Sequence, residues 1–77
     1  MLYARECIEL MAAFPGRDFR IGEIIKYVNG GKALDGKRRL AIRVGVYRVM
    51  QQLSESGSVL IRPSSAKRGG YANYRWR

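Results

Sequence analysis

Residues 59–76 read VLIRPSSAKRGGYANYRW, with two short runs that favour β-structure on either side of a basic, glycine-rich segment. The first run covers residues 59–62. In the second, residues 71–76, Ala72, Tyr74 and Trp76 alternate with their neighbours, as they do in a strand with two different faces. Residues 63–70 have the proline, serine and glycine content of a loop. The pattern therefore predicts a β-hairpin.

Three segments before this hairpin carry apolar residues at helical spacing, which predicts helices over about residues 2–14, 21–28 and 38–56. Pro15-Gly16 ends the first helix, and Asn29-Gly30-Gly31 ends the second. Residues 17–20, between these helices, are expected to be short and extended. The stripes predicted to face inward are Tyr3, Cys7, Leu10, Met11 and Phe14 on the first helix, and Ile42, Val46, Val49 and Leu53 on the third.

The order helix, short strand, helix, helix and hairpin is typical of a winged helix-turn-helix domain. We therefore predict an α+β fold in which three helices are followed by a two-stranded β-hairpin wing, in a single DNA-binding domain over residues 1–77. In such domains the third helix conventionally enters the DNA major groove, and the wing contacts the backbone or the minor groove.

The charge of the chain points to the same class of partner. Fifteen Lys and Arg residues stand against six Asp and Glu, with no histidine, for a formal net charge of +9. Basic and acidic residues balance in residues 1–36, whereas residues 37–77 contain one acidic residue, Glu55. An excess of this size on so small a domain indicates a polyanionic partner.

The candidate DNA-binding residues form two groups. Three adjacent cations at the start of the third helix oppose the helix dipole, so stability alone does not favour them there. Arginine side chains on this helix can reach phosphates or the O6 and N7 atoms of guanine. Cations in the wing suit phosphate contact or insertion into the minor groove. The predicted site comprises Lys37, Arg38, Arg39, Arg43, Tyr47, Arg48, Arg62, Lys67, Arg68 and Arg75. A solvated charged face, and an edge strand protected by charge, are the structural alternatives.

Other residues have structural interpretations. Cys7 lies on an inward stripe, where a free thiol acts as a small apolar filler. Gly45, inside the third helix, predicts a close helix-to-helix approach. Tyr74 and Trp76 share a strand face and are expected to cover the core beneath the wing.

Several classes of protein are not expected. The chain has no histidine, and its acidic residues show no paired spacing, so we predict neither an enzyme nor a metal or cofactor site. Residues 31–37 match the first part of a phosphate-binding loop, but Arg38 replaces the required Ser or Thr. No stretch of 18 to 20 apolar residues and no signal-peptide pattern is present, so we expect a cytoplasmic protein and no membrane partner.

Four motifs of the last third resemble the end of the PapI/FaeA family, small winged-helix regulators of bacterial fimbrial operons. They are Leu53-Ser54-Glu55-Ser56-Gly57-Ser58-Val59, Arg62-Pro63, Lys67-Arg68-Gly69 and Ala72-Asn73-Tyr74-Arg75-Trp76. The resemblance implies the winged-helix fold, DNA-linked regulation, association with the bacterial nucleoid and action with a larger DNA-bound partner, the leucine-responsive regulatory protein. The chain departs from the family in a longer wing, in a longer basic connection over residues 30–39, and at Arg20, where many winged helices place a Ser or Thr cap.

The sequence thus predicts a small basic DNA-binding transcriptional regulator that uses the third helix, the wing and the connection over residues 30–39. Two alternatives remain open. One is an RNA-binding accessory protein. The other is a protein-interaction module that acts with a larger DNA-bound partner, favoured by Leu40 and Val44 on the outer side of the third helix. The target sequence, the direction of regulation and the oligomeric state stay open.

Overall fold

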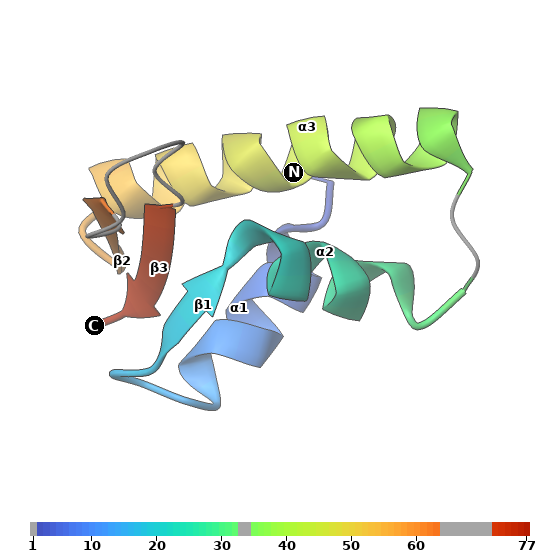
Figure 1. The fold of residues 1–77 in the computed structure, drawn as a ribbon. Coiled ribbons are helices and arrows are strands. Elements are labelled where there is room, and N and C mark those ends of the chain that lie inside the picture. The colour runs from blue at the N-terminus through green and yellow to red at the C-terminus, as the bar shows by residue number, and fades with distance from the viewer. Residues whose placement is uncertain (1, 33–34, 64–71) are drawn as a thin grey trace.

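The computed structural model describes residues 2–32, 35–63 and 72–77. Within them the fold is α+β. Its elements are α1 (Ala4–Ala12), β1 (Asp18–Arg20), α2 (Ile21–Asn29), α3 (Gly36–Glu55), β2 (Val59–Pro63) and β3 (Ala72–Trp76). In Figure 1, α3 runs along one edge of the molecule, α1 and α2 lie below it, and β2 and β3 stand near its C-terminal end. The predicted order of elements is confirmed.

The sheet has one strand more than the two-stranded wing that the sequence predicts. Its order is β1-β3-β2 with both pairings antiparallel, so β3 is the central strand. Tyr74 of β3 lies opposite Phe19 on one side and Ile61 on the other. The second edge of β3 would otherwise present unpaired backbone N–H and C=O groups, and the short segment 18–20 covers it.

The core confirms most of the predicted stripes. Cys7 and Met11 of α1 and Ile42, Val46 and Val49 of α3 are buried, together with Phe19, Ile24, Val59 and Tyr74 from the other elements. Phe14 is the exception, because its side chain is 48% exposed. Since α1 ends at Ala12, Phe14 no longer follows helical spacing, and its ring lies against Arg17 instead.

The helix ends follow from local chemistry. The carboxylate of Asp35 accepts a hydrogen bond from the backbone N–H of Arg38 at 2.7 Å, so α3 begins two residues before the predicted start. Gly30 ends α2 in the left-handed conformation, as predicted. None of the helices in the described ranges combines the length and the apolar character needed to cross a membrane.

Candidate nucleic-acid interface

One flank of α3 brings together three of the predicted site residues. Arg39, Arg43 and Tyr47 follow each other at intervals of four residues, so they lie along one side of the helix. They line a hollow of about 700 Å³ with Arg20 at the start of α2 and Tyr74 of β3. We call this space the central hollow. Residues from three elements that are distant in the sequence therefore meet beside the basic helix.

Arg43 is held against Tyr47 one turn further along α3. Its guanidinium carbon lies 5.6 Å from the centroid of the Tyr47 ring, and its Nη2 atom donates to the Tyr47 hydroxyl at 3.5 Å. A cation above the face of an aromatic ring is attracted by the ring quadrupole. The contact orients the arginine without neutralising its charge.

Tyr74 joins the sheet to this flank. Burial raises the pKa of the Tyr74 hydroxyl above its usual value, the neighbouring Tyr47 adds to the rise, and the cation of Arg43 opposes it. The expectation that Tyr74 belongs to the core is confirmed, since its side chain is buried. Its position fixes β3 next to the Arg43–Tyr47 pair.

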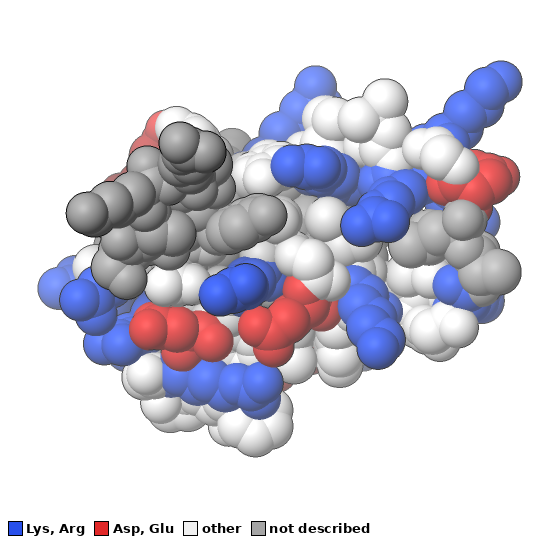
Figure 2. Space-filling view, viewed as in Figure 1, with Lys and Arg blue, Asp and Glu red and all other residues white. Residues whose placement is uncertain are grey.

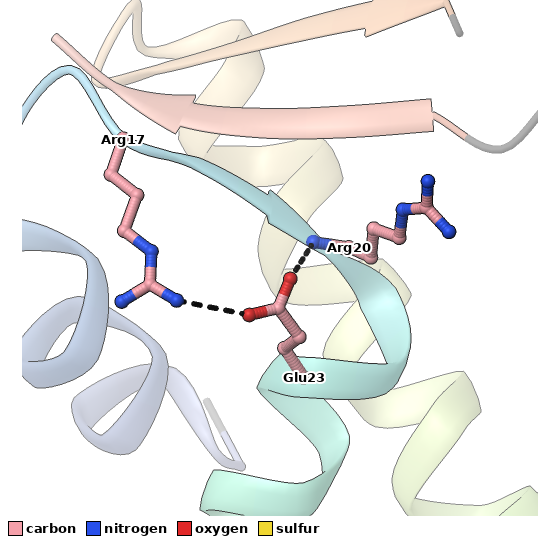
Figure 3. A network of polar contacts seen from close by, with 3 residues as sticks. All are labelled: Arg17, Arg20 and Glu23. Carbon is pink, nitrogen blue, oxygen red and sulfur yellow. Dashed lines mark hydrogen bonds and ion pairs between the residues drawn. The ribbon is translucent and has the colours of Figure 1, made fainter.

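The N-terminus of α2 borders the central hollow, and Glu23 caps it (Figure 3). Glu23 accepts a hydrogen bond from the backbone N–H of Arg20 at 3.1 Å, and its other oxygen lies 3.2 Å from Nη2 of Arg17. An arginine side chain has no acceptor, so it cannot replace a Ser or Thr cap. Glu23 makes the other bond of a capping box, because it accepts from the backbone N–H of Arg20 itself, and the Arg20 side chain extends away from it.

The remaining predicted residues of α3 lie on its other side or at its first turn. Arg48 lines a separate hollow of about 510 Å³ with Val44, Tyr47 and Gln51. We call this space the outer hollow. Lys37 and Arg38 are exposed in the first turn. The cations of α3 therefore do not form one cluster but occupy two flanks.

The charges of α3 are not compensated by neighbouring acids. The ion pairs of the described residues are Arg5–Glu9, Arg17–Glu23 and Arg75–Asp18, and none of them includes a cation of α3. In Figure 2 the Lys and Arg side chains lie over α3 and the neighbouring part of α2 and also near the β-strands, while acidic side chains lie over β1, α2 and the start of α3. What distinguishes the cations of α3 is therefore the lack of an ion pair among the described residues.

The predicted residues of the wing have different surroundings. Arg62 is exposed on β2, whereas Nε of Arg75 lies 2.9 Å from the carboxylate of Asp18 on β1. Lys67 and Arg68 lie outside the described residues.

Arg20 and Arg62 both lie opposite Asn73, so the three residues share one face of the sheet. Arg20 was not among the site residues that the sequence predicts, but it lines the central hollow with Arg39 and Arg43. Its place between the short strand and the second helix was a usable signal.

Nothing in the described part of the chain forms a metal site, since no group of three or more Cys, Asp or Glu side chains is suitably placed there. Cys7 is fully buried, as predicted. Burial, with a smaller contribution from Glu6, raises the pKa of its thiol to about 11. A thiol that stays protonated is a poor nucleophile and a poor metal ligand.

The sequence matches no protein-family model, and comparison with curated proteins and with solved structures found no match either.

Proposed function

We propose that the protein is a winged helix-turn-helix regulator of transcription that binds double-stranded DNA. In this proposal α3 enters the major groove. The β2–β3 hairpin and the connection before α3 contact flanking phosphates, and the nearly neutral first half of the chain is the scaffold. The site of action would be the bacterial nucleoid, and the proposal includes no catalysis and no cofactor.

The observation that carries the proposal is that the cations on the two flanks of α3 form no ion pairs with described carboxylates. Among the described residues, no carboxylate forms an ion pair with Lys37, Arg38, Arg39, Arg43 or Arg48. Like charges on one helix repel, and the first three also oppose the helix dipole. Because these residues lower the stability of the free helix, a polyanion that neutralises them accounts for their presence.

The dimensions of an exposed helix such as α3 are compatible with duplex DNA. An α-helix with its side chains is about 10 to 12 Å in diameter. The major groove of B-DNA is about 12 Å wide and admits an α-helix.

Fluorescence anisotropy of a labelled random-sequence duplex, titrated at several salt concentrations, tests the proposal. If about five phosphates are neutralised, the logarithm of the binding constant should fall with the logarithm of salt at a slope of about −4 to −5. A slope of about −1 would contradict the proposed mechanism, because it corresponds to about one neutralised phosphate. An RNA hairpin of the same length should be titrated in parallel with the duplex. Tighter binding of the hairpin would favour the RNA alternative.

Two variants with the same change of charge locate the binding surface. Arg43→Gln removes a cation of the central hollow and should weaken binding and reduce the salt slope by about 0.9. Arg5→Gln removes a cation of α1 that is already paired with Glu9. It should leave the slope unchanged. Equal losses in the two variants would indicate a general effect of net charge.

The second candidate function is a protein-interaction module. The exposed apolar side chains of α3 favour it. Leu40 is 62% exposed and Val44 is 43% exposed. The resemblance to the PapI/FaeA family implies a larger DNA-bound partner of this kind. Complex formation with a protein that survives high salt and is insensitive to Arg43→Ala would favour this function over direct DNA binding.

A further inference from the structure

One exposed line of α3 begins with two apolar side chains. Leu40 and Val44 are four residues apart and therefore adjacent on the helix surface, and Gln51 continues the same line two turns later. The line lies opposite the buried row formed by Ile42, Val46 and Val49. We call Leu40, Val44 and Gln51 the outer ridge. Exposed apolar side chains of this size that adjoin each other indicate a contact surface.

Cations stand on both sides of the outer ridge. At 100° per residue, Arg43 lies about 80° from the centre of the ridge in one direction and Arg48 about 60° in the other. The two hollows agree with this geometry, since Arg43 lines the central hollow and Arg48 lines the outer hollow with Val44. The outer ridge therefore lies between the two groups of predicted site residues on α3.

This arrangement matches one class of surface, the major groove. The groove has a phosphate backbone on each side, and its floor carries an apolar group wherever a thymine presents its C5-methyl. A protein surface that covered Leu40 and Val44 would also have to compensate the cations on both flanks. Gln51 adds an amide, the side-chain group that pairs with the N6 and N7 atoms of adenine.

On the basis of the proposed function, we infer that the outer ridge reads A·T base pairs, with Leu40 and Val44 in contact with thymine methyl groups. Glu55 sets the limit of the ridge, because its carboxylate accepts from Gln51 at 3.5 Å and would repel phosphates beyond that point. The reading surface therefore extends from Leu40 to Gln51.

A chemical substitution in the DNA isolates this contact. An alternating A·T duplex and the same duplex with deoxyuridine in place of thymidine differ in the major groove by the methyl group alone. Burial of one methyl group corresponds to about a fourfold change in affinity. We expect the deoxyuridine duplex to bind at least about fourfold more weakly, with the same salt slope.

The variants Leu40→Ala and Val44→Ala should each reduce this discrimination, and together they should abolish it. Both positions are exposed and alanine favours helix, so unchanged circular dichroism is the check on folding. Ile8→Ala is the matched control, since Ile8 is also exposed, at 37%, but lies on α1, in the half of the chain that the proposal assigns to the scaffold. The control should keep the full preference for the thymidine duplex.

The outcomes separate the inference from the proposed function. Equal binding of the two duplexes with a steep salt slope overturns the inference and leaves the proposed function standing. Absence of duplex binding at low salt overturns both. If sedimentation shows a dimer that Leu40→Ala and Val44→Ala dissociate, while the two duplexes bind equally, the ridge is an interface between copies of this chain and the inference is wrong.

Discussion

The ring of Tyr3 packs directly on the backbone of Gly45, so that a Cβ atom built at position 45 would lie 2.6 Å from Cδ2 of the ring. Tyr3 precedes α1 and has a φ of 69°, a left-handed conformation that no other non-glycine residue in the described ranges adopts. A close approach at Gly45 is confirmed, but the partner is the side chain of Tyr3, just before α1, and not the body of a second helix. The contact positions α1 against the middle of α3.

Gly45→Ala should destabilise the protein, although alanine is the better helix former. The methyl group needs the space of the Tyr3 ring, and overpacking of this kind typically costs about 1 to 3 kcal/mol. Gly22→Ala in α2 is the control, because a Cβ there meets nothing within 4 Å. That variant should be more stable by about 0.5 to 1 kcal/mol. Thermal unfolding measures both, and a stabilised Gly45→Ala would contradict the packing.

Glu23 should stabilise the fold mainly through the N-terminus of α2. Glu23→Ala removes both the acceptor for the Arg20 N–H and the partner of Arg17, and we expect a loss of about 1 kcal/mol. Glu23→Gln keeps the acceptor and loses only an exposed ion pair, so its loss should be less than half as large. Urea denaturation at one salt concentration compares them. Equal losses would mean that the ion pair, and not the cap, is the stabilising contact.

The raised pKa of Cys7 predicts a loss of stability at high pH. The unfolded thiol loses its proton near its ordinary pKa of about 9, whereas the folded thiol keeps its proton up to about 11. Unfolding therefore releases a proton between about pH 9 and pH 11. The stabilisation that Cys7 gives the folded state is fully present below pH 9 and is lost as the pH rises to about 11. The slope is at most about 1.4 kcal/mol per pH unit.

The comparison of wild type with Cys7→Ala isolates this effect from other groups that titrate at high pH. The difference in unfolding free energy between the two proteins should be constant below pH 9 and should shrink above it. At pH 8 the native thiol should also react slowly with iodoacetamide and rapidly in denaturant. Rapid alkylation of the native protein would contradict the burial of Cys7.

Asp18→Asn should strengthen the binding of duplex DNA. The change releases Arg75 from its ion pair, on a sheet face that also carries Arg20 and Arg62. We expect the salt slope to steepen by up to about 0.9, the value for one more phosphate contact. Glu9→Gln is the matched control, because it also removes one negative charge and releases Arg5 on α1. The same gain in both variants would assign the effect to net charge, and Arg75 would then have no place in the interface.

Much of this fold could be predicted because its signals are local. Apolar residues at helical spacing indicated the three helices, and glycine at position 30 indicated the end of α2. The burial of Cys7, the exposure of Leu40 and Val44 and the concentration of charge in residues 37–77 also follow from periodicity and composition. Each of these features depends on residues within a few turns of one another, so neighbours in the sequence are sufficient to determine it.

The tertiary structure alone decided which distant residues meet. Asp18 and Arg75 pair across 57 residues, and this pairing belongs to the third strand that the predicted wing lacked. Phe14 lies outside the core because α1 ends at Ala12. Arg20 lies beside the cations of α3 because β1 leads directly into α2 next to them. A periodic pattern specifies which face of an element is buried. The partner of that face is selected by packing and hydrogen bonding among all the elements together, which no single segment of the sequence encodes.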